Sequence, residues 1–270
     1  MELCMFSKRL QGLSFKELGR TLKELGFDGV DLTVRSGGHI KPEEVRDKLP
    51  EAKEILASQG INISMITTAI REIGEPHARD VLETAGSVGV GYFKLRPFRY
   101  EGFGTLKKSM AEVSAKLKGI EPVCRESGIR AGFQTHSQNY LGASVPHILR
   151  MIEDCDPQWV GVYYDIGHAA VEGGHAAWRM NLDDVSERLF MLAVKDMKLV
   201  RREVKSVRYS GWRGEVVPFG DGLVDWKEFA ACIKQLKFDG PCSFHSEYEV
   251  SMDKVIEQTR KDMEFFRALF

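Results

Sequence analysis

The sequence has little of what marks a nucleic-acid-binding or membrane protein. It carries 38 Lys and Arg against 39 Asp and Glu, a formal net charge of −1, so no strong positive field would attract a nucleic acid or an anionic membrane. No apolar run approaches the ~20 residues that a membrane-spanning helix needs. The first residues lack a basic segment followed by an apolar one, so we expect no signal peptide. We therefore predict neither nucleic acid nor membrane as a partner.

Close-spaced cysteine pairs are missing as well. The chain has five cysteines, an odd number: Cys4, Cys124, Cys155, Cys232 and Cys242. Such a set is typical of reduced, buried thiols rather than of a disulfide framework. We therefore expect a cytoplasmic protein.

What the sequence does contain is a regular alternation of strand and helix signals. Short apolar runs rich in β-branched and aromatic residues predict eight strands. They cover residues 2–6, 30–34, 61–67, 91–95, 129–136, 159–165, 189–196 and 241–247. Eight strand–helix units of roughly 30 residues each predict an α/β fold, a single (β/α)8 TIM barrel that spans residues 1–270 as one domain. A doubly wound open sheet is the alternative, but the first strand is not followed by its Gly-x-Gly-x-x-Gly motif.

Two connections give weaker signals. Between the sixth and seventh strands, only residues 181–188 predict a helix. Between the seventh and eighth strands lies a basic stretch, residues 198–213, that is typical of a solvated loop. Because the loop is long, it could close over a site as a lid.

Polar side chains follow most of the predicted strands. They are Arg35 and His39 after the second strand, Lys94 and Arg96 at the fourth, Gln134, His136 and Asn139 at the fifth, Asp165 and His168 at the sixth, Lys195 and Asp196 at the seventh, and His245, Glu247 and Glu249 at the eighth. Each alone also fits a structural role, such as a hydrogen-bonded His, a helix cap or a solvated charge. The C-terminal ends of the strands of a TIM barrel face one pocket, so we expect these groups to form a functional site there.

Several segments resemble the xylose-isomerase-like TIM barrels of the sugar phosphate isomerase/epimerase type. The most specific are residues 164–168, 194–196, 218–226 and 238–241, and the similarity covers nearly the whole chain. The resemblance implies an isomerase or epimerase, or a related lyase, that acts on a small carbohydrate. Such an enzyme removes a proton next to a carbonyl and passes through an enediolate. It also implies one divalent metal, bound by Glu, Asp, His and Glu at the ends of strands five to eight.

The implied metal site is altered in this chain. Only Asp165 matches, since Gln134 stands in place of the first Glu, Ala193 in place of the His and His245 in place of the last Glu. Gln cannot act as a base and Ala cannot bind a metal. The remaining candidate ligands, Asp165, Gln134, His136 and His245, would suit Mn²⁺, Zn²⁺ or Fe²⁺ better than Mg²⁺, or would hold no metal at all.

The resemblance and the residues together suggest a role for each candidate. We expect Glu247 to be the general base, His168 to bind or protonate a substrate oxygen, and Lys195 to stabilise the enolate oxygen beside a metal or in its place. The candidates for binding substrate oxygens, or a phosphate, are Arg35, His39, Lys94, Arg96 and Asn139. One alternative is a barrel that has lost catalysis and binds a sugar or a protein partner. The chain could also form a homo-oligomer.

Overall fold

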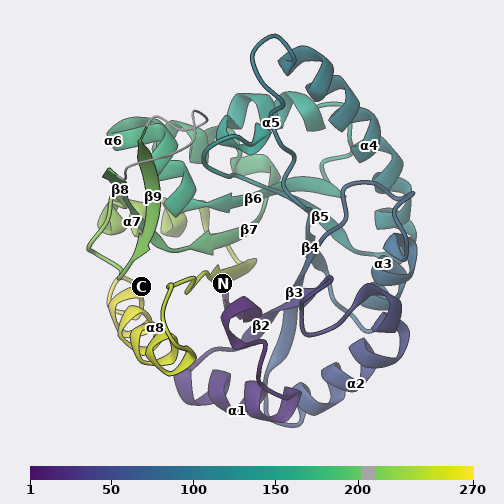
Figure 1. The fold of residues 1–270 in the computed structure, drawn as a ribbon, viewed down its shortest axis with the longest axis vertical. Helices are drawn as coiled ribbons and strands as arrows, with labels where there is room; N and C mark the ends of the chain where they lie inside the picture. Colours follow the sequence, from purple (N-terminus) through teal and green to yellow (C-terminus); the bar gives the residue numbers. More distant parts are fainter. Residues whose placement is uncertain (202–210) are drawn as a thin grey trace.

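Eight parallel strands close into a barrel in the computed structural model, which describes residues 1–201 and 211–270. They are β1 (Glu2–Phe6), β2 (Gly29–Val34), β3 (Asn62–Thr68), β4 (Tyr92–Lys94), β5 (Arg130–Gln134), β6 (Val160–Asp165), β7 (Leu189–Val194) and β10 (Pro241–Phe244). They hydrogen-bond in the order β1-β10-β7-β6-β5-β4-β3-β2, so the first strand pairs with the last (Figure 1). The predicted (β/α)8 TIM barrel is confirmed.

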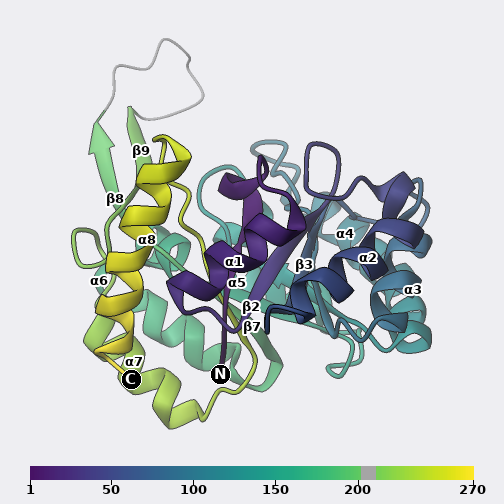
Figure 2. The same ribbon diagram turned by 90° about the horizontal axis from the view of Figure 1, so that it is seen from below.

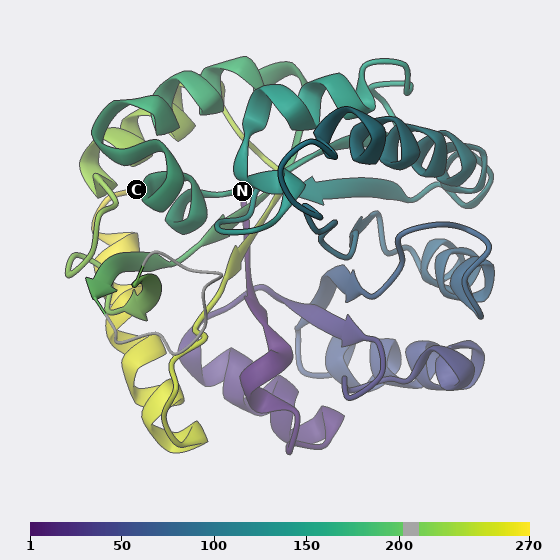
Figure 3. The ribbon, with the colours of Figure 1, turned by 45° about the horizontal axis from the view of Figure 1, so that its top comes forward.

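Helices surround this barrel (Figure 3). They are α1 (Phe15–Leu25), α2 (Val45–Ala57), α3 (Ala78–Ser87), α4 (Leu106–Ser127), α5 (Val145–Ile152), α6 (Ile166–Asp184), α7 (Trp226–Leu236) and α8 (Met252–Arg267). The first and last, α1 and α8, are in contact and complete the ring. None of the helices in the described part of the chain is long and apolar enough to cross a membrane.

Helix α1 shows how the local sequence fixes such an element. Ser14 and Glu17 form a capping box, in which each side chain accepts a hydrogen bond from the other residue's backbone N–H. Leu18, Leu22 and Leu25 recur at helical spacing and are buried against the barrel. The capping box therefore fixes where the helix begins, and one apolar face packs the helix against the barrel.

Helix α6 is longer than the sequence predicts. A helix was expected only over residues 181–188, whereas α6 begins directly after β6, where the Asp165 side chain accepts from the His168 N–H. Inside it, Gly174 has a non-helical backbone, with φ of 57° and ψ of −145°. The predicted range overlaps α6 only at residues 181–184, and residues 186–188 form a short 3-10 helix instead.

The connection after β7 also differs from the prediction of a long unstructured loop. Strands β8 (Asp196–Arg201) and β9 (Trp212–Val217) pair antiparallel as a hairpin. Figure 2 shows this hairpin standing clear of the barrel beside α8. The rest of the predicted lid, residues 202–210, lies outside the described residues. The flanks of the basic stretch are therefore ordered strands.

Candidate active site

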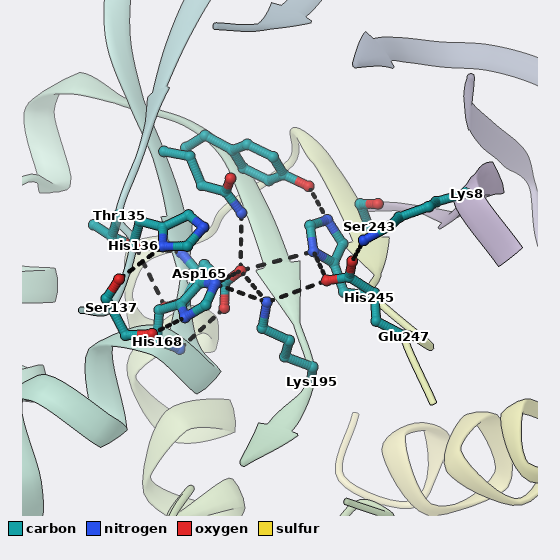
Figure 4. Close-up of polar contacts among 12 residues, drawn as sticks. Lys8, Thr135, His136, Ser137, Asp165, His168, Lys195, Ser243, His245 and Glu247 are labelled. Carbon is teal, nitrogen blue, oxygen red and sulfur yellow. Dashed lines mark hydrogen bonds and ion pairs between the residues drawn. The ribbon is translucent and has the colours of Figure 1, made fainter. Parts of the chain in front are cut away.

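Lys195 lies at the centre of a buried cluster at the C-terminal ends of β6, β7 and β10 (Figure 4). Its Nζ is 3.0 Å from Asp165 Oδ2, 3.5 Å from Glu247 Oε2 and 2.9 Å from His168 Nε2. The topology explains this meeting, because β6 ends at Asp165, β7 ends one residue before Lys195 and β10 ends three residues before Glu247. Asp165 and His168 at the end of β6 and Glu247 after β10 thus surround one ammonium group.

The charged groups of this cluster stabilise one another's ionised forms. Burial alone would raise the pKa of Asp165 and Glu247 and lower the pKa of Lys195. Lys195 makes the largest contribution against burial and, together with the other groups around each carboxyl, holds the pKa of both well below its usual value, while the two carboxylates raise the pKa of Lys195. All three groups are therefore charged at neutral pH.

His168 is directed at Lys195 rather than at open space. An ammonium only donates hydrogen bonds, so Nε2 of His168 accepts from Lys195 and the ring proton lies on Nδ1, 2.8 Å from Ser137 Oγ. Burial, followed by the nearby Lys195 charge, lowers the pKa of His168 well below its usual value. In this arrangement His168 is neutral and has no proton on Nε2 to give to a substrate, so it orients Lys195.

Glu247 bridges two lysines. Its Oε1 lies 2.6 Å from Lys8 Nζ, on the opposite side from Lys195, and Arg9 donates to its backbone carbonyl at 3.1 Å. The Glu247 side chain is 20% exposed, whereas Asp165 is fully buried. Glu247 is therefore the acid of this cluster that a substrate can reach. Lys8 has no sequence signal that would have linked it to the site, since it follows β1 in a short 3-10 helix.

A layer of buried polar groups lies beneath the cluster, inside the barrel. Asp31 accepts from Thr67 Oγ1 at 2.7 Å and from Ser243 Oγ at 3.0 Å. His245 Nε2 is 2.8 Å from the Tyr163 hydroxyl, and its buried Nδ1 has no hydrogen-bond partner among residues 1–201 and 211–270. That Nδ1 lies 3.7 Å from both Asp165 Oδ2 and Glu247 Oε2. No pattern in the sequence indicates Asp31, Thr67 and Tyr163, because buried strand residues give no local sign of polar pairing.

The predicted metal ligands do not fit a metal. Gln134 directs its amide N–H, not its oxygen, at Asp165, with Nε2 at 2.9 Å from Oδ2. His136 stacks on His168 with ring centroids 4.2 Å apart, and its Nδ1 faces the Ser137 carbonyl. Within residues 1–201 and 211–270, no group of three or more His, Cys, Asp or Glu side chains could hold a metal ion. Lys195 occupies the position beside Asp165 that a cation would take, so the predicted ligands do not form a metal site in this arrangement.

Three of the predicted substrate-binding residues line one pocket next to the cluster. Arg35, Lys94 and Arg96, together with Lys8, lie in the wall of a pocket of about 410 Å³. The loops after β1, β2, β3 and β4 form this pocket. The structure therefore brings these cations together at the same end of the barrel as Lys195.

Two other predicted residues lie elsewhere. The His39 ring is held by Thr33 Oγ1 at 3.2 Å from Nδ1 and by the Leu10 carbonyl at 3.1 Å from Nε2. Both of its nitrogens thus fix the loop after β2, and burial lowers its pKa. Asn139 is exposed in the loop after β5, where its backbone carbonyl accepts from Tyr100. Neither side chain belongs to the cluster or to the lining of the pocket.

A model of a known protein family matches most of this chain. The model, described as xylose isomerase-like TIM barrel, covers residues 20–269. The chain belongs to the xylose isomerase-like TIM barrel family. The expected resemblance is thus confirmed over nearly the whole chain.

Two curated relatives of this xylose isomerase-like chain are named inosose dehydratase. The one from Bacillus velezensis is 24% identical over 270 residues, which is 88% of this chain and 86% of the relative. The one from Geobacillus kaustophilus is 28% identical over 123 residues, 44% of this chain, and that match spans only 39% of the relative's length.

Solved structures of other xylose isomerase-like proteins superpose over nearly the full chain. A 3-keto-D-glucoside 4-epimerase from E. coli has a TM-score of 0.74 at 16% identity and covers 99% of both chains. The IolI protein, solved with a bound zinc atom, has a TM-score of 0.75 at 15% identity and covers 100% of this chain and 99% of its own. At these identities the likeness shows the shared fold.

One motif of the xylose isomerase-like chain has a structural role. The buried Asp196 carboxylate accepts from the backbone N–H groups of Met197, Gly220, Gly222 and Val224 and from the Trp226 indole. A Cβ on Gly222 would collide with this carboxylate. Asp196 therefore ties the start of the β8–β9 hairpin to the segment that returns to α7, directly next to Lys195.

Proposed function

We propose that this chain is an enzyme that removes the proton next to the carbonyl group of a keto-sugar or of a related cyclic keto-polyol. One observation carries the proposal: Lys195 Nζ lies between Asp165 and the accessible acid Glu247 at the C-terminal end of the barrel. This pairs a base with a positive charge where such barrels bind substrates. The names of its relatives, inosose dehydratase and 3-keto-D-glucoside 4-epimerase, support this class of chemistry.

In this mechanism Glu247 acts as the general base. Its carboxylate takes the proton from the carbon next to the carbonyl, and the electron pair of the broken C–H bond moves onto the carbonyl oxygen. Its low pKa keeps it unprotonated at neutral pH. Lys8 and Lys195 hold its two oxygens from opposite sides, so the carboxylate is fixed before the substrate arrives.

Lys195 stabilises the negative charge that develops on the oxygen. A fixed ammonium in a water-poor site stabilises an enolate strongly, because it does not need to reorganise during the reaction. His168 and Asp165 hold this ammonium in place. Protonated Glu247 can then return its proton to the former carbonyl carbon, while the neighbouring hydroxyl proton passes to the enolate oxygen, which gives an isomer. It can instead protonate a hydroxyl group on the next carbon, which leaves as water. An epimer requires protonation of the enolate from its opposite face by a second donor. The dehydratase and epimerase relatives support the last two outcomes.

The test is the exchange of substrate protons with solvent deuterium. The wild-type chain and Glu247→Gln are incubated in D2O with a panel of keto-sugars that includes an inosose and a 3-keto-glucoside, and NMR follows the signal next to the carbonyl. We expect the wild type to exchange or convert at least one of them and Glu247→Gln to be slower by at least about a thousandfold, since the amide cannot accept the proton.

The matched control is Glu249→Gln. Glu249 is 67% exposed, lies two residues further along and pairs with Arg213 outside the cluster, so this variant should keep wild-type exchange. Equal exchange by Glu247→Gln and the wild type would remove Glu247 from the role of base. Sugar binding without exchange in the wild type would favour a barrel that only binds its ligand.

A further inference from the structure

The pocket beside the cluster is lined by positive charge. Four cationic side chains, Lys8, Arg35, Lys94 and Arg96, contribute to its wall, and none of the lining residues that the structure describes is acidic. Like charges brought together repel one another, so a folded protein gathers four of them around a cavity at a cost. An anion in the pocket would offset that cost.

Lys94 is the most informative of the four. It is only 6% exposed at the end of β4, lines the pocket, and forms no side-chain hydrogen bond or ion pair within residues 1–201 and 211–270. Lysines are almost never fully buried unless they are paired. Burial, and after it the Arg35 and Lys195 charges, lower the pKa of Lys94 to about 8, although Asp31 and Glu247 act in the opposite direction. A largely buried lysine that lines a cavity and has no acidic partner at hydrogen-bond distance in the described residues indicates a ligand with negative charge.

The two arginines around Lys94 are also available to a ligand. Arg35 lies with its guanidinium carbon 5.6 Å from the centre of the Phe6 ring, which orients the group. Neither Arg35 nor Arg96 pairs with an acid in the described part of the chain. Guanidinium groups bind phosphate and carboxylate oxygens in pairs through parallel N–H donors. The pocket therefore combines a buried point charge with two donors suited to a planar or tetrahedral oxyanion.

Lys8 connects this pocket to the base. It lines the pocket and its Nζ lies 2.6 Å from Glu247 Oε1. A substrate with its reacting carbon at Glu247 would thus have the rest of its body over the ends of β1 to β4, where the cations are. One molecule can occupy both places.

We propose that the substrate is an anionic carbohydrate whose phosphate or carboxylate group binds in the pocket formed by Lys8, Arg35, Lys94 and Arg96. This rests on the proposed function for the reacting end of the molecule, whereas the anion site itself follows from the pocket alone. Phosphate and carboxylate share the chemistry that these cations recognise. The neutral parent sugars lack the group that would neutralise Lys94.

The anion site is tested first without any sugar. Isothermal titration calorimetry measures the binding of inorganic phosphate, and separately of acetate, to the full chain. We expect one of them to bind to the wild type and to bind at least tenfold more weakly to Lys94→Met and to Arg35→Gln. Lys16→Met, on the exposed face of α1, should bind like the wild type. Thermal unfolding of each variant shows whether it is folded.

The substrate class is tested by matched pairs in the deuterium exchange assay. Each keto-sugar is offered as its phosphate ester, as its sugar acid and as the neutral parent. We expect kcat/KM of the wild type to favour one anionic member at least a hundredfold over the neutral one, and Lys94→Met to lose most of that preference. Whether the phosphate ester or the sugar acid is favoured shows which of the two groups the pocket binds.

The two proposals fail in different ways. Rapid exchange of neutral sugars, with no binding of phosphate or acetate and no effect of Lys94→Met, would overturn the anion site and leave the proposed function standing. Binding of an anion that Lys94→Met abolishes, with no exchange of any sugar, would remove the proposed function and leave the anion site.

Discussion

The Lys195 ammonium and the Asp165 carboxylate lie 3.0 Å apart, with their side chains 2% and 0% exposed. Water is thus largely excluded from this pair, and the charges depend on each other and on Glu247 and His168. A buried ion pair is strongly destabilised when one partner is removed, because the other is left as an uncompensated charge. The same contact that would serve catalysis therefore contributes to the stability of the barrel.

Replacing Lys195 by Met should destabilise the fold by about 3–5 kcal/mol and abolish exchange. The substitution should also reverse the direction in which a fall in pH changes the free energy of unfolding. In the wild type, the pKa values of Asp165 and Glu247 are lowered, so their contribution is complete above the unfolded pKa values near 4 and is lost as the pH falls from there through the lower folded pKa values. Without the cation, burial raises the pKa of Asp165, and the variant should gain stability as the pH falls from 7 to 5.

Urea unfolding at pH 5 and pH 7 measures both effects. The control is Lys8→Met, since Lys8 is 43% exposed and its pair with Glu247 should contribute no more than about 1 kcal/mol. A Lys195→Met variant that is as stable as the wild type at pH 7 would contradict the account of the buried pair.

Chelation should have no effect on activity or stability. Lys195 already occupies the position beside Asp165 that a divalent cation would take, and Gln134 offers Asp165 an N–H rather than an oxygen. We expect elemental analysis of the purified protein to find much less than one bound metal per chain. Dialysis against EDTA should leave both the exchange rate and Tm unchanged. Loss of exchange on chelation that Mn²⁺ or Zn²⁺ restores would show that the cluster rearranges to bind a metal.

Anion binding should weaken above pH 8. The pKa of Lys94 is lowered to about 8 by burial, with Arg35 and Lys195 acting in the same direction against Asp31 and Glu247. Lys94 is charged below this pH and loses its proton as the pH rises through it, so the affinity for an anion should fall about tenfold between pH 7 and pH 9, in proportion to the charged fraction. Calorimetry of phosphate binding across this range gives the profile. In Lys94→Arg, which stays protonated, the fall should disappear.

The loop held by Asp196 should be a sensitive point for folding. Asp196→Ala removes a buried acceptor from five donors, and each donor left unsatisfied costs about 1–3 kcal/mol. We expect a loss of at least about 3 kcal/mol in the free energy of unfolding. Asp225→Ala, which removes only the N-cap of α7, should cost about 1 kcal/mol. Similar losses for the two variants would show that the loop does not depend on Asp196.

The fold could be predicted from the sequence because every barrel strand has an apolar run and lies between helical patterns. The β8–β9 hairpin could not, since only three of the twelve residues in its strands are buried and they form no apolar alternation. For the site, the strand ends indicated Asp165, Lys195 and Glu247, because the topology of a barrel brings strand ends together. Lys8 and Asp31 had no such signal, since one pairs through a long side chain and the other lies inside the barrel.

The pair between Lys8 and Glu247 joins residues 239 positions apart, and β1 meets β10 at the same seam of the barrel. At ordinary elongation rates, Glu247 would be synthesised roughly 10 to 50 s after Lys8. The first strand has no neighbour on that side until the last one is made. The cluster can therefore form only after β10 has been synthesised, so any activity that depends on it would report closure of the whole barrel.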